Sequence, residues 1–126
     1  NLVGINDYQI FSNDYSFNEN IERGFDFYIN NFFTNDGKSK YFNNKIYPID
    51  IHSPAQFIVT LVKLNKHNQN RVLMNKVLEW TITNMKDKSG FFYYQKHKFY
   101  TNKIQYMRWS QAWMFYSLSK LIFNEK

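Results

Sequence analysis

Cysteine is absent from the 126 residues, which excludes disulfide bonds and thiol catalysis. No apolar run approaches the roughly 20 residues of a membrane-spanning helix, so a membrane is not an expected partner. The four glycines fit turns, and none forms a glycine-rich phosphate loop. His52, His67 and His97 lie in separate connections without the spacing of a metal site. We therefore expect neither a metal nor another cofactor.

The net charge of +6 favours anionic partners in general, but the basic residues are dispersed along the chain. Without a dense basic cluster, the aromatic residues between them give only weak support to nucleic-acid binding. Aromatic residues make up 21% of the chain. Such residues can build a core in which tyrosine hydroxyls reach a polar surface. An AT-rich genome would produce a similar composition, so the excess has two possible explanations.

The second half of the chain repeats the pattern of the first. Each half has an amphipathic helix, then a long connection with glycine and tyrosine, and then a helix that is apolar on most sides. Repeats of roughly 20–50 residues are typical of arrays of one supersecondary unit, here an α-hairpin. The sequence therefore predicts an all-α fold of α-hairpin repeats in a single domain, residues 1–126.

The spacing of apolar residues predicts where these helices lie. The residues before about Phe17 show no clear period and are expected to be irregular. Ser53 is expected to cap the second helix, with Pro54 at its first position. Trp80, Trp109 and Trp113 are expected in the core. An ordered loop or a small hairpin is expected in the first long connection, and a small β-hairpin in the second. The predicted helices span residues 18–33, 55–64, 71–85 and 107–123.

Amphipathic outer helices thus alternate with apolar inner helices. Both long connections run from an outer helix into an inner one, so we expect them on the same side of the domain. Helix N-termini favour anions, which makes this side a candidate ligand face. The polar residues expected to gather there are Asp50, His52, Gln56, Tyr106, Arg108 and Gln111.

Two segments at the inner-helix starts resemble the α/α-toroid, or six-hairpin glycosidase-like, proteins. Trp109-Ser110-Gln111-Ala112-Trp113 is similar to the Arg-Gly-Gln-Ala-Trp element of unsaturated glucuronyl hydrolases. Asp50-Ile51-His52-Ser53-Pro54-Ala55 is similar to their Asp-x-Ser-Ala element. The superfamily also includes N-acylglucosamine 2-epimerases. Both segments together resemble uncharacterised bacterial proteins associated with surface-polysaccharide synthesis.

The resemblance implies a cytoplasmic protein that processes or binds a carbohydrate, with an acidic or acetamido sugar held at the inner-helix N-termini. Two hairpins are one third of a six-hairpin ring. We therefore expect the chain to be the C-terminal part of a larger toroid protein, with the rest of the toroid or another copy covering its flanks. Trp109 takes the place of the family's Arg, and the hydrolases' acid/base Asp has no counterpart. Whether the chain is an enzyme stays open, and a non-catalytic helical-repeat scaffold is the alternative.

Two of the candidate residues suit catalysis, and each has a structural alternative. Asp50 is a candidate general acid or base, or a carboxylate that orders the start of a helix. His52 is a candidate proton shuttle, or a hydrogen-bonded loop histidine.

The other four suit substrate binding. Arg108 can clamp a carboxylate or phosphate, or pair with an acid such as Asp50. Gln56 and Gln111 occupy matching places in the repeat and can bind sugar hydroxyls or tie loops to helix ends. Tyr106 can stack on a sugar ring or pack within a loop.

Overall fold

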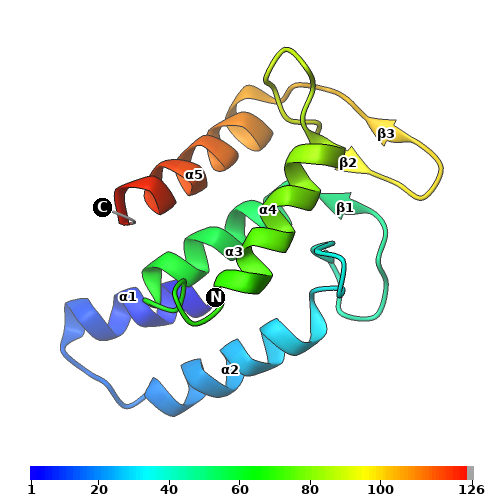
Figure 1. The fold of residues 1–126 in the computed structure, drawn as a ribbon. Coiled ribbons are helices and arrows are strands. Elements are labelled where there is room, and N and C mark those ends of the chain that lie inside the picture. The colour runs from blue at the N-terminus through cyan, green and yellow to red at the C-terminus, as the bar shows by residue number, and fades with distance from the viewer. Residues whose placement is uncertain (125–126) are drawn as a thin grey trace.

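The computed structural model describes residues 1–124, which form a mainly helical domain with a small sheet at one end (Figure 1). The expectation of a helical fold is confirmed in this coarse form, whereas the toroid repeat stays a prediction. The α-helices are α1 (Leu2–Ser12), α2 (Asn18–Asn31), α3 (His52–Lys63), α4 (Arg71–Met85) and α5 (Ala112–Asn124). The remaining elements are the strands β1 (Ile49–Asp50), β2 (Gln95–Lys96) and β3 (Thr101–Asn102), and the π-helical turn η1 (Met107–Gln111).

Helix α3 is the centre of the domain, because its residues are apolar on most sides and need neighbours all round. It packs along α5 and also contacts α1 and α4. Figure 1 shows α3 and α5 running in one direction and α2 and α4 in the other.

Two groups of buried side chains hold these elements together. The first joins four helices and consists of Phe25, Phe57, Ile58, Leu61, Met74, Val77 and Leu121. The second lies at the end of the domain that carries the long connections, and consists of Ile49, Ile51, Ala55, Met85, Phe92 and Met114. Because Ile49, Ile51 and Ala55 of this group are buried, they fix the positions of Asp50 and His52, which lie between them in the sequence.

The first 12 residues form a helix, so the expectation of an irregular lead-in is wrong. Tertiary contacts explain the difference. Gly24 of α2 leaves room for the Leu2 side chain, since a Cβ there would lie 2.8 Å from Leu2 Cδ2. The buried Gln9 donates from Nε2 to Asn18 Oδ1 at 2.8 Å. These contacts stabilise α1 although its own sequence carries no clear apolar stripe.

The predicted cap of α3 is also wrong. The helix begins at His52, with Ile51 at the N-cap position, and no side chain of the cap residue closes it. Asp50 takes this role instead, because its Oδ1 accepts the His52 backbone N–H at 2.9 Å. Pro54 lies within the first turn, where its missing N–H costs no helical hydrogen bond.

The sheet joins the two long connections. β1, from the first connection, pairs antiparallel with β2, from the second, so that Asp50 lies opposite Gln95. β2 pairs antiparallel with β3 to form a hairpin. The expectation that both connections lie on one side of the domain is therefore confirmed. In the first connection, where an ordered loop or a small hairpin is expected, the structure has a loop with one isolated bridge between Phe42 and Lys45.

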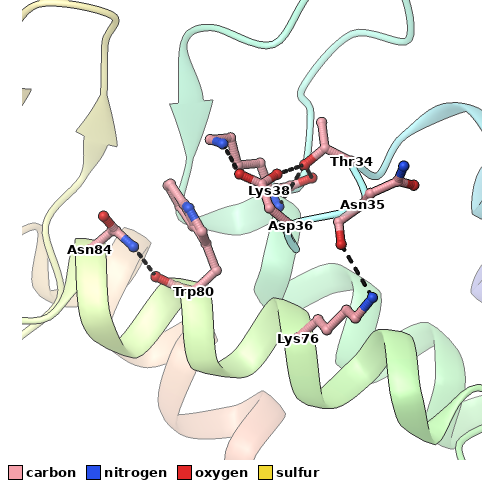
Figure 2. A network of polar contacts seen from close by, with 7 residues as sticks. All are labelled: Thr34, Asn35, Asp36, Lys38, Lys76, Trp80 and Asn84. Carbon is pink, nitrogen blue, oxygen red and sulfur yellow. Dashed lines mark hydrogen bonds and ion pairs between the residues drawn. The ribbon is translucent and has the colours of Figure 1, made fainter.

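The turn that opens the first connection is fixed on α4 (Figure 2). Lys76 Nζ donates to the Asn35 carbonyl oxygen at 3.3 Å, and Lys38 forms an ion pair with Asp36. Gly37 has a φ of +87°, and a Cβ there would lie 2.3 Å from the Lys76 carbonyl oxygen. Only glycine allows this approach, which directs the following residues toward the sheet.

Trp109 and Trp113 are not core residues, contrary to expectation. Trp109 belongs to η1 and is 55% exposed, and Trp113 lies in the first turn of α5 and is 37% exposed, because α5 packs against α3 along one side only. Across the described chain, residues 1–124, each helix is too short or too polar to cross a lipid bilayer.

Candidate functional site

A cleft of about 520 Å³ opens at the start of α3, where the two long connections meet. Residues of the first connection, of the segment around β2 and of η1 all contribute to it. Its walls combine aromatic rings with a carboxylate, an imidazole and an amide. The lining residues are Tyr41, Phe42, Pro48, Asp50, His52, Tyr94, Gln95 and Trp109.

Asp50 is held in this cleft by three hydrogen bonds. Its Oδ1 accepts the backbone N–H of His52 and the His52 Nδ1, both at 2.9 Å. Its Oδ2 accepts Gln95 Nε2 at 2.8 Å. Asp50 is only 4% exposed, and these donors offset the cost of burying its carboxylate.

His52 is oriented by Asp50 on one side and by two indole rings on the other. Because Oδ1 is an acceptor, the contact at 2.9 Å places the proton of a neutral imidazole on Nδ1. The ring packs edge-on against Trp109 and Trp113, with centroid distances of 4.6 and 6.0 Å. Nε2 is buried and has no hydrogen-bond partner within residues 1–124. A ligand can therefore reach Nε2 only if neighbouring side chains move.

Aromatic rings form the walls of the cleft and continue beyond it. Tyr41 and Phe42 meet edge to face, with ring centroids 4.8 Å apart. Tyr94 meets Tyr106 in the same way at 5.0 Å, and both line a neighbouring hollow with Trp109. Burial, and then the nearby Asp50 carboxylate, raise the pKa of the Tyr94 hydroxyl. That hydroxyl therefore remains a neutral donor beside the carboxylate at physiological pH.

Four of the sequence-predicted residues lie outside the cleft lining. Gln111 pairs with the backbone of Phe92, accepting its N–H at 2.9 Å and donating to its carbonyl oxygen at 2.6 Å. Gln56 donates to Thr60 Oγ1 within α3 at 3.3 Å. Arg108 is exposed and forms no ion pair with Asp50 or with any other acid in residues 1–124. Tyr106 lines the neighbouring hollow.

Sequence reasoning therefore brings Asp50 and His52 to the site but misses Gln95. Gln95 reaches Asp50 only through the pairing of β1 with β2, across 45 positions of sequence. No local pattern marks such a contact. Indole rings are usually buried, so the sequence predicts Trp109 in the core, and only the structure shows that it is exposed and lines a cleft.

Comparisons with protein-family models, with curated proteins and with solved structures find no match to this chain. Within the described residues, no group of three His, Asp or Glu side chains is placed to hold a metal ion. The geometry of the cleft is therefore the basis on which a function can be argued.

Proposed function

We propose that the cleft binds a sugar, and that the chain is part of an α/α-toroid protein of bacterial polysaccharide metabolism. Sugar binding is supported by the combination of aromatic walls and fixed polar groups in one cleft. A sugar ring presents apolar C–H faces and hydroxyl edges. Aromatic rings contact such faces, while polar groups in the lining, such as the Gln95 amide and the Tyr94 hydroxyl, bind the hydroxyls. The two motifs at the inner-helix starts support the wider assignment, as does the opposite running of successive helices from α2 to α5.

The charge of the cleft bears on which sugar fits. The carboxylate that lines it belongs to Asp50, and the Gln95 amide next to it is neutral. Arg108, the cation expected to pair with an acidic sugar, does not line the cleft. A neutral or acetamido sugar therefore fits this lining better than an acidic one, since it brings no second negative charge to Asp50.

The hydrogen bonds favour binding over hydrolysis. Both oxygens of Asp50 already accept hydrogen bonds from the protein, so its carboxylate acts first as an anchor for His52 and Gln95. The free nitrogen of His52 is buried beside two indole rings. A general acid or base needs hydrogen-bond reach to its substrate, which neither group offers in this arrangement.

Titration calorimetry with glucose, N-acetylglucosamine and glucuronic acid tests the proposal. We expect binding to weaken about tenfold in Tyr41→Ala, the loss of one aromatic contact. Tyr15→Ala is the matched control, because both tyrosines are 52% exposed and Tyr15 lies outside the cleft. Binding that is unchanged in Tyr41→Ala and in Trp109→Ala would refute the cleft as the sugar site. Failure to bind any of the three sugars would count against the proposal itself.

A scaffold module is the second candidate, and the outer side of α5 favours it. Phe115, Ile122 and Phe123 are 75%, 57% and 73% exposed on a helix whose other side packs against α3. Exposed apolar patches of this kind mark contacts with other proteins. The rest of a toroid or another copy of the chain would cover this side. Sedimentation equilibrium of the chain and of Phe115→Ser tests self-association, and a monomeric mass for both would exclude another copy.

A further inference from the structure

The net positive charge of the chain lies in its last third. Residues 1–87 hold nine acidic and nine basic residues, and Glu125 and Lys126 cancel. Residues 88–124 hold six basic residues and no acidic one. The basic residues look dispersed because lysines occur throughout, but the uncompensated ones are confined to this acid-free segment, residues 88–124. They are Lys88, Lys96, Lys98, Lys103, Arg108 and Lys120.

These six side chains have no acidic partner in the described chain. The three lysine–carboxylate ion pairs found in residues 1–124, and the His52–Asp50 contact, all lie between residues of the balanced part, 1–87. Lys98 and Lys103 lie over the rings of Phe99 and Tyr93, at 5.2 and 5.1 Å from the ring centroids. At longer range, Lys103 contributes to lowering the pKa of Asp87. The segment as a whole keeps its positive charge for an external anion.

Large apolar side chains are exposed within the same segment. Phe99 and Tyr100, in the turn between β2 and β3, are 88% and 62% exposed. Ile104 and Met107, which follow β3, are 52% and 78% exposed. Figure 1 shows the β2–β3 hairpin reaching away from the helices. The hairpin is therefore an apolar tip between unpaired lysines.

We propose that this hairpin, residues 95–102 with the flanking Lys103, docks the protein on an anionic lipid surface. Phe99 would enter the boundary between headgroups and acyl chains, where aromatic rings are favoured. Lys96, Lys98 and Lys103 would lie at the level of the anionic headgroups, each adding to the attraction. The lack of a membrane-spanning run does not argue against this, because surface docking needs only an apolar insertion and a basic surround.

The exposed side chains favour lipid over a single-stranded nucleic acid. Base stacking needs free ring faces, but His97 stacks on Tyr100 with centroids 4.2 Å apart and an interplanar angle of 10°. One face of the exposed Phe99 ring carries the Lys98 ammonium, 5.2 Å from the ring centroid. Ile104 and Met107 have no ring at all, so bases gain nothing from them. A lipid interface accepts both aliphatic and aromatic side chains.

Co-sedimentation with lipid vesicles tests the proposal. One set is pure phosphatidylcholine, and the other contains one part phosphatidylglycerol to two parts phosphatidylcholine. We expect binding to the anionic vesicles, weakened by salt, and little binding to the neutral ones. Lys96→Ala with Lys98→Ala should weaken it about 25-fold, at about fivefold for each basic residue. The matched control, Arg23→Ala with Lys86→Ala, removes the same charge from the balanced part of the chain and should leave binding nearly unchanged.

A second pair of variants tests the apolar insertion. Phe99→Ala should weaken vesicle binding about tenfold. Phe11→Ala should not, although Phe11 is 89% exposed and Phe99 is 88% exposed. The proposal would be overturned if either variant weakened vesicle binding no more than its matched control. Equal binding to neutral and anionic vesicles would overturn it as well. So would retention on single-stranded DNA that depends on Phe99 without any vesicle binding.

Discussion

Replacing Asp50 by alanine should lower the free energy of unfolding by about 4 kcal/mol. Asp50 is 4% exposed and accepts three hydrogen bonds, two from His52 and one from Gln95. Hydrogen bonds to a charged group contribute about 1.5–3 kcal/mol each, and a buried donor left unpaired costs about 1–3 kcal/mol. Alanine leaves space that water can enter, and this water can accept hydrogen bonds from the donors that Asp50 leaves behind. The expected loss of about 4 kcal/mol is therefore well below the sum of the separate terms.

Asp50→Asn is the matched variant, because it keeps the shape of the side chain. Its Oδ1 still accepts both donors of His52, and the Gln95 amide can rotate so that its oxygen accepts from the new Nδ2. The free energy of unfolding should fall by only about 1 kcal/mol in this variant. The comparison separates the hydrogen-bonding capacity of the site from its negative charge.

Urea unfolding, followed by circular dichroism, measures both variants. A loss of about 4 kcal/mol moves the midpoint by roughly 2 M when the urea dependence is unchanged. The free energy of unfolding of a domain is about 5–15 kcal/mol in total, so Asp50→Ala should still fold. If the asparagine variant loses as much as the alanine variant, the charge and not the hydrogen bonds holds the site. If neither loses more than about 1 kcal/mol, Asp50 does not anchor the junction, and the reasoning fails.

Three further predictions concern the loops around the site. Gly37→Ala should lower the free energy of unfolding by at least about 2 kcal/mol more than Gly90→Ala, as thermal unfolding would measure. Both glycines have a positive φ, but only at Gly37 would the added Cβ collide with backbone atoms. The Ser89 hydroxyl and then its backbone N–H hold the pKa of Asp87 at about 2, against an ordinary 3.8. The stability from this depressed pKa is present above pH 3.8 and is lost as the pH falls toward 2. Asp87→Asn should remove this acid-dependent loss, and unfolding curves across that pH range check it. Gln111→Ala should cost about 2 kcal/mol and speed amide exchange in the loop that its side chain holds.

Local patterns predict most of the helices. A helix is made from hydrogen bonds between neighbours in sequence, so the three- and four-residue spacing of Ile21 and Phe25, or of Phe57 and Leu61, marks its buried side directly. The same reasoning places α4 at residues 71–85, as the structure has it. The lack of a clear stripe in residues 2–12 led to a missed helix, because α1 depends on its contacts with α2 and α3.

The sequence by itself thus determined the helical class of this protein, the position of α2, α3 and α4 to within a few residues, and the closeness of Asp50 to His52. Only the tertiary structure decided that Gln95 meets Asp50, that Trp109 walls a cleft, and that the lysines of the β2–β3 hairpin have no acidic partner. The physical reason is the range of the interactions. Helical periodicity depends on residues three and four positions apart. Strand pairing, exposure and charge balance depend instead on residues that the fold brings together from distant parts of the chain.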